Sequence, residues 1–197
     1  MSNADGRREG ASPLRQTLKR DTAELHRRLE IDLGLLEFDL SLERYRRVLE
    51  LFFGFYAPVE AGVALAGRAR GLPLRDRTTL LESDLLWLGL SRRELADLPR
   101  CADLPRLSSP EELAGCLYVL EGACLGGQVI APALRERLGV AKGTGAAFFT
   151  GDEEGTAARW RLFLAWLEDV ASAGSGTAAI VASARATFLA FAQWVER

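Results

Sequence analysis

A serine-proline helix start near the middle of this 197-residue chain limits its fold more than any other feature. Ser109 is followed by Pro110 and, three positions after the serine, by Glu112. A serine N-cap, a proline at the first helical position and a glutamate at the third together favour the start of a helix. Gly139 then supplies a stop signal. The spacing therefore predicts one long helix over residues 110–139.

The remaining segments also have helical periodicity, and none shows the alternation of a half-buried strand. A proline inside the second helix, Pro58, should kink or interrupt it. The segment 140–155 is predicted as a loop with room for one turn of helix. The other predicted helices are 13 onward (opened by Ser12-Pro13), 42–67 (capped by Ser41), 76–89, 92 onward (capping box of Ser91 and Glu94), 153–173 and 176–196.

Length and composition suit a single all-α domain of about seven or eight helices over residues 13–197. Hydrophobic residues make up 48% of the chain, enough for a substantial core. The net charge of −2 gives no reason to expect a nucleic-acid partner. There is no run of 18 apolar residues and no signal-peptide core, so we expect no membrane-spanning helix and a cytoplasmic protein. Residues 1–12 are predicted to be a disordered tail.

The three cysteines, Cys101, Cys116 and Cys124, form no CxxC pair. An odd number of cysteines argues against a disulfide framework, and the spacings fit no usual zinc site. All three are predicted to be small buried hydrophobic residues.

The single histidine, His26, lies on the first predicted helix. On a helical wheel, His26, Lys19 and Glu30 lie along one edge of an apolar leucine stripe. This border position lets a neutral imidazole nitrogen face an apolar cavity, as an iron ligand must. Glu30, one turn later, is placed to accept a hydrogen bond from the other ring nitrogen, directly or through water.

Taken alone, these residues leave three interpretations open. His26 and Glu30 can form a half-buried structural pair, which is the commoner arrangement. His26 can instead bind iron, or it can act as a general acid or base, although no second histidine or nucleophile accompanies it. Lys19, about 10 Å along the axis from His26, is placed to meet a carboxylate at the rim of a large flat ligand.

Three glycines, Gly122, Gly126 and Gly127, weaken the long helix, since each costs about 0.8–1 kcal/mol relative to alanine. Gly115, Gly122 and Gly126 fall within about 40° of one another on the wheel, and Gly127 lies further round. A face without side chains lets another helix pack backbone to backbone, or lets a flat ligand lie against the exposed backbone. The adjacent pair favours the ligand, because successive glycines also soften and bend a helix.

The motif "LEGACLGGQVI" in the long helix and "TAELHRRLE" near the N-terminus together resemble the haem oxygenases. The form "YVLEGxxLGGQVI" is similar to the bacterial, biliverdin-producing branch often associated with bacteriophytochromes. The resemblance covers residues 13–197. It implies a single-domain helical bundle with haem between the first helix and a kinked, glycine-rich distal helix. It also implies an oxidoreductase that uses O2 and an external electron donor to cleave haem to biliverdin, carbon monoxide and ferrous iron.

The resemblance assigns the central roles residue by residue. His26 matches the proximal iron ligand, and Glu30 matches the acceptor that orients it. Gly122 matches the distal glycine whose backbone approaches the ligand on the iron. Gly126 and Gly127 match the pair that lets the distal helix bend over the haem.

Four further positions concern the rim of the haem and the route of protons. Lys19 matches a lysine near the haem propionates, and Arg161 stands near another basic position of this type. Tyr118 lies one residue from where some members place a propionate-binding tyrosine. Ala123 stands where many members have an aspartate that organises the water network for proton delivery. This departure leaves the proton route and the attacked meso carbon open, and we expect a water chain held by backbone carbonyls of the distal helix with Tyr118.

The implied cofactor is haem, which is also the substrate. The implied partners are O2, a ferredoxin-like or reductase electron donor and, as acceptor of the bilin, a bacteriophytochrome. Two rival interpretations remain at this point. One is a haem carrier or sensor of the same fold without turnover, which Ala123 motivates. The other is a helical interaction module with no cofactor, in which the glycine face packs helices.

Overall fold

The computed structural model describes residues 12–67, 76–151, 155–173 and 176–197. Every regular element in these ranges is a helix, and there are eight, so the predicted all-α class is confirmed. The predicted tail, apart from Ser12, lies outside the described residues. The helices are α1 (Pro13–Leu33), α2 (Leu42–Gly67), α3 (Arg77–Trp87), α4 (Arg92–Asp97), α5 (Pro110–Leu138), α6 (Ala147–Thr150), α7 (Thr156–Ala173) and α8 (Thr177–Val195).

The helix ends follow the local signals in the sequence. The side chains of Ser12 and Ser109 accept hydrogen bonds from backbone N–H groups in the first turns of α1 and α5. Ser91 and Glu94 form the predicted capping box at α4. Gly139 ends α5 with φ 69°, a left-handed conformation that favours glycine.

Two local expectations can be refined. Helix α2 continues from Leu42 to Gly67 through Pro58, which has no N–H and so removes one hydrogen bond from the ladder without ending the helix. Buried residues on both sides of the proline, Tyr56 and Val59 among them, pack both halves into the same core. The predicted loop 140–155 contains the four-residue helix α6.

Aromatic rings at the centre of the core join α2, α6 and α8. The Phe52 ring of α2 lies 5.1 Å from that of Phe148 and 5.6 Å from that of Phe149, both on α6. It also lies 5.0 Å from the ring of Phe191 on α8. The rings are buried, so α6, although short, is anchored in the core. The three cysteines are buried, as predicted, and none of them is in a disulfide in the structure.

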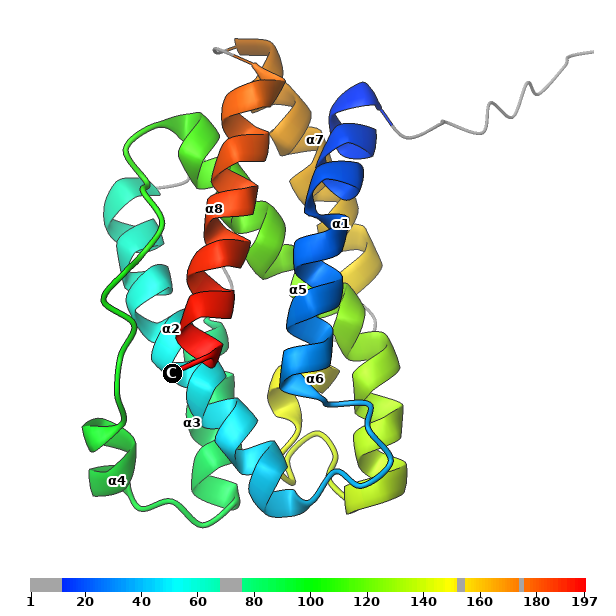
Figure 1. The fold of residues 1–197 in the computed structure, drawn as a ribbon, viewed down its shortest axis with the longest axis vertical. Helices are drawn as coiled ribbons and strands as arrows, with labels where there is room; N and C mark the ends of the chain where they lie inside the picture. The colour runs from blue at the N-terminus through cyan, green and yellow to red at the C-terminus, as the bar shows by residue number, and fades with distance from the viewer. Residues whose placement is uncertain (1–11, 68–75, 152–154, 174–175) are drawn as a thin grey trace, which may run out of the picture.

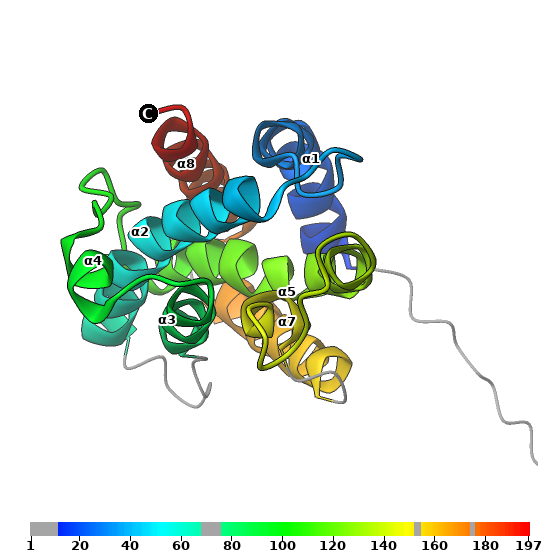
Figure 2. The same ribbon diagram turned by 90° about the horizontal axis from the view of Figure 1, so that it is seen from below.

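The two helices that matter most for function are α1 and α5. α1 packs on α8, and α8 in turn packs on α5. Figure 1 shows that both α1 and α5 run from the top of the molecule to the bottom. In Figure 2 the first half of α5 lies across the view and its second half runs along the line of sight, so the helix changes direction near its middle. The expected bend of this helix is therefore present.

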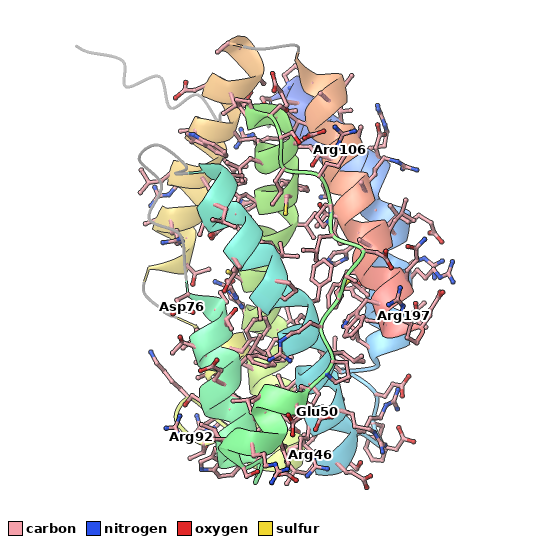
Figure 3. The ribbon with its side chains drawn as sticks, turned by 90° about the vertical axis from the view of Figure 1, so that its left-hand side faces the viewer. Arg46, Glu50, Asp76, Arg92, Arg106 and Arg197 are labelled. Atoms are coloured by element: carbon pink, nitrogen blue, oxygen red, sulfur yellow. The ribbon has the colours of Figure 1, made fainter. Side chains whose placement is uncertain are left out.

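The connection from α4 to α5 closes one side of the bundle. Figure 3 shows it passing along the outside of the helices to Arg106, near the start of α5. It is tied down where Cys101 N donates to Gly54 O at 2.9 Å. A Cβ atom on Gly54 would lie 2.7 Å from Pro99 O, so glycine is needed for this approach.

Three helices are long and apolar enough to cross a membrane when judged by length and composition alone. About half of each stretch is buried inside the fold, where it supplies the core of the bundle. The stretches are Leu42–Ala66, Pro110–Leu138 and Thr177–Val195.

Candidate active site

His26 lies on α1 with 53% of its side chain exposed. Its Nδ1 is 3.4 Å from Oε2 of Glu30, one turn later, so the expected pairing is present. The imidazole and the Phe188 ring of α8 form a T-shaped pair, with 5.8 Å between ring centroids. Because Nδ1 faces the carboxylate, Nε2 is the nitrogen that remains for a ligand.

Two of the glycines on α5 are explained by packing. A Cβ atom on Gly115 would lie 2.3 Å from Ile180 O of α8. A Cβ atom on Gly127 would lie 2.1 Å from Phe149 O of α6. Both obstacles are backbone atoms, which cannot move aside as the end of a side chain can. The packing interpretation therefore holds for Gly115 and Gly127, and close approach to α6 is a use of Gly127 that the sequence did not reveal.

The other two glycines have no such obstacle. The nearest atom to a Cβ on Gly122 is the end of the Trp160 ring, at 3.9 Å. For Gly126 it is Ile130 Cδ1 of the same helix, also at 3.9 Å. Both distances are ordinary van der Waals contacts, so the described fold would accept alanine at either position. Packing does not explain why the backbone at Gly122 and Gly126, called the bare strip below, carries no side chains.

A contact between α1 and α5 lies close to His26 and Gly122 along their own helices. Tyr118 of α5 forms a side-chain hydrogen bond with Thr22 of α1. Both helices run downward in Figure 1, but the first half of α5 is inclined to α1. His26 lies one turn beyond Thr22 on α1, and Gly122 lies one turn beyond Tyr118 on α5, so each is one helical turn from this contact.

Burial raises the pKa of the Tyr118 phenol, and its hydrogen bond with Thr22 partly offsets that rise. The phenol therefore remains protonated at neutral pH. Its ring lies 5.9 Å from the Trp160 ring of α7, which closes the same end of the site.

Tyr118→Phe should lower the free energy of unfolding by about 1 kcal/mol, because it removes one side-chain hydrogen bond between α1 and α5. Urea unfolding of Tyr118→Phe, Thr22→Val and the double variant tests this. If the two single effects simply add in the double variant, the hydrogen bond does not couple the helices.

The remaining predicted residues are Lys19, Ala123 and Arg161. Lys19 is exposed on α1, two turns before His26 and along the same edge. Ala123 is half-buried. Arg161 is exposed on α7, where its Nε donates to Ala157 O of its own helix at 3.4 Å. The structure therefore pairs His26 with Glu30 and bonds Arg161 to its own helix.

Several neighbours of the site were not predicted from the sequence. Glu121, next to Gly122, forms a bidentate ion pair with Arg159 of α7, with both N–O distances 3.1 Å. These side chains are only 11% and 23% exposed, so the pair fastens α7 to α5 beside the bare strip. Phe188 and Trp160 belong to the site wall. None has a local sequence signal, since each is defined by a contact with a distant helix.

This arrangement suits a flat ligand that carries its own metal. Within residues 12–67, 76–151, 155–173 and 176–197, no group of three or more histidine, cysteine or carboxylate side chains could hold a metal ion. One half-exposed imidazole can supply a single axial ligand when a macrocycle supplies the others. Backbone without side chains, as at Gly122 and Gly126, is what the close approach of a flat ligand requires.

Comparisons with known proteins concern the chain as a whole. The family model described as Heme oxygenase matches residues 12–197. A curated protein named "Heme oxygenase" from Xanthomonas campestris pv. campestris (strain 8004) is 34% identical over 160 residues, which cover 80% of this chain and 90% of that protein. The NO- and CO-bound heme oxygenase structure from Neisseria meningitidis has a TM-score of 0.76 with 20% sequence identity. That match covers 94% of this chain and 92% of the other.

Proposed function

This chain belongs to the haem oxygenase family, and we propose that it cleaves haem to biliverdin, carbon monoxide and ferrous iron, using O2 and an external electron donor. Family membership supports haem degradation; the biliverdin product is our proposal. The observation that carries it is the bare strip at Gly122 and Gly126. These glycines have room for a Cβ that the chain does not use, and Gly122 lies one helical turn beyond Tyr118, which contacts α1.

His26 would hold the iron through Nε2, and Glu30 would orient the ring by accepting from Nδ1. Bound haem supplies both the iron that activates O2 and the ring that is oxidised. The backbone at Gly122 and Gly126 would line the opposite face, where it admits a diatomic molecule and little else. Phe188 would exclude water from the imidazole side.

Polar groups at the rim would orient the ring and deliver protons. Lys19 is placed for a propionate, and Arg161 is a weaker candidate because the structure shows it bonded to its own helix. Ala123 provides no acid. The protonated Tyr118 Oη can donate a proton to water held by α5 carbonyls, and its hydrogen bond with Thr22 holds that oxygen in place.

Supply of a bilin chromophore, with a bacteriophytochrome as acceptor, is the physiological role that we propose, in the cytoplasm. A ferredoxin-like protein or a reductase would provide electrons.

A time course of the visible spectrum tests the activity. Purified protein is mixed with stoichiometric haem, and ascorbate is added in air with catalase present. We expect the Soret band to decay while biliverdin absorption grows. A stable, protein-bound Soret band would instead indicate the carrier or sensor that Ala123 motivates, and no Soret band at all would indicate a helical module without a cofactor.

Glu30→Gln should lower both haem affinity and turnover by about tenfold, the lower end of the effect of removing a partner that orients a metal ligand. The low end is expected because the Glu30 side chain is 63% exposed and water can take its place. Haem titration and the ascorbate assay measure the two effects. Glu24→Gln, on an exposed residue of the same helix that pairs with Arg27, is the matched control.

A further inference from the structure

The short helix α6 is held by a buried carboxylate of α3. Asp84, only 1% exposed, accepts from Ala147 N at 2.7 Å and from Phe148 N at 2.8 Å. Both oxygens are used, one for each backbone N–H. Hydrogen bonds to a charged acceptor are among the stronger ones in proteins, so this contact fixes the start of α6.

A buried arginine at the other end of α3 holds the same helix and also contacts α5. Arg77 is 3% exposed, and its Nη2 donates to Phe148 O at 2.9 Å. The guanidinium lies 4.2 Å from the centroid of the Phe148 ring. Its Nη1 contacts Sγ of Cys124, which lies on α5 just before the glycine pair. The carboxylate and the guanidinium therefore bind the N–H and C=O groups of one small segment.

The next carbonyl of α6 meets α5 at the glycine pair. Phe149 O is the atom that a Cβ on Gly127 would strike at 2.1 Å. Contacts thus run without a break from α3, through α6, to the part of α5 where Figure 2 shows the helix changing direction. Nothing in this series of contacts touches the face of α5 that Gly122 and Gly126 leave bare.

We propose that Asp84 and Arg77 are positioning residues, which set the direction of the second half of α5 by holding the α6 carbonyl against Gly127. A packed core has discrete arrangements, so a segment held at Ala147 N, Phe148 N and Phe148 O presents the next carbonyl, Phe149 O, as a stop for the helix. The consequence for haem, a fixed height of the α5 backbone over the ring, rests on the proposed function. The mechanical part of the proposal, the positioning of α5 by α6, does not depend on that function.

Asp84→Asn tests the mechanical part in haem-free protein. The variant keeps the shape of the side chain but leaves one of the two N–H groups without an acceptor. We expect amide hydrogen exchange over residues 124–131 and α6 to accelerate at least about tenfold, while α1 is unchanged. The control is Asp76→Ala, which removes the N-cap of α3 (Figure 3) without touching α6 and should leave residues 124–131 as in the wild type.

Equal acceleration over residues 124–131 in Asp84→Asn and Asp76→Ala would overturn the proposal, because general weakening of α3 would then suffice. If Asp84→Asn does not fold, Arg77→Lys gives the same readout: it keeps the charge but cannot reach both Phe148 O and Cys124.

A second measurement tests the consequence for haem. In haem-loaded protein with carbon monoxide added, the C–O stretching band should broaden or shift in Asp84→Asn and not in Asp76→Ala. An unchanged band with accelerated exchange would remove the link to the haem site while leaving the mechanical role in place. Failure of wild-type protein to bind haem would count against the proposed function alone.

Discussion

Replacing His26 with alanine should reduce haem turnover by more than about 100-fold, which exceeds the usual loss from removing a mere orienting partner of a ligand. The structure offers the iron one imidazole, and no other histidine exists in the chain. The haem-free fold should survive, because 53% of the side chain is exposed. We expect a change in the free energy of unfolding within about 0.5 kcal/mol. The ascorbate time course and urea unfolding measure the two quantities.

Added imidazole provides the sharper form of this test. His26 is exposed enough for a free imidazole to enter the space that the alanine leaves, so millimolar imidazole should restore part of the turnover in His26→Ala. Arg27→Ala, on the same helix and exposed, should keep wild-type turnover. Full turnover in His26→Ala without imidazole would show that His26 and Glu30 are only a structural pair.

Features that depend on nearby residues were predictable from the sequence. The caps at Ser12, Ser91 and Ser109 depend on neighbours three positions away, and all three were predicted and found. The His26–Glu30 contact is likewise a matter of one helical turn. The arrangement of these elements around haem came from the resemblance of two motifs to a family.

Features that depend on distant residues were not predictable in this way. Tyr118 was assigned from the family pattern, but its partner Thr22 lies on another helix. Arg161 was chosen as a basic residue of α7, whereas the arginine joined to α5 beside the site is Arg159. The two arginines are two residues apart, about 200° around the helix, and only the packing of α7 decides which of them faces α5.

The glycines show the same limit most clearly. On a wheel, Gly115, Gly122 and Gly126 share a face and invite one explanation. The structure divides them, because α8 backbone lies against Gly115 while Gly122 and Gly126 meet only the ends of side chains. A helical wheel gives the direction of a residue but not what lies opposite it.

Alanine substitutions at these glycines should therefore have opposite effects on the stability of the haem-free protein. Gly122→Ala should raise the free energy of unfolding by up to about 1 kcal/mol, since alanine favours the helix and the new Cβ has room. Gly115→Ala should lower it by about 1–3 kcal/mol, because its Cβ would lie 2.3 Å from Ile180 O and the helices must separate. Urea unfolding of the two haem-free variants measures the difference.

The order should reverse once haem is added. Gly122→Ala places a methyl group where the ring or its small ligand must approach the backbone, and a displacement of about 1 Å can cost about 100-fold in rate. We therefore expect turnover to fall by about 10- to 100-fold in the more stable variant. Gly115→Ala should keep most of its turnover at a temperature where it remains folded, because its side chain points at α8.

If Gly122→Ala instead weakens the haem-free protein as Gly115→Ala does, the bare strip belongs to helix packing. If Gly122 were kept only for helix packing, alanine at this position would destabilise the protein. A gain in stability together with a loss of turnover would therefore exclude packing as the only reason for this glycine.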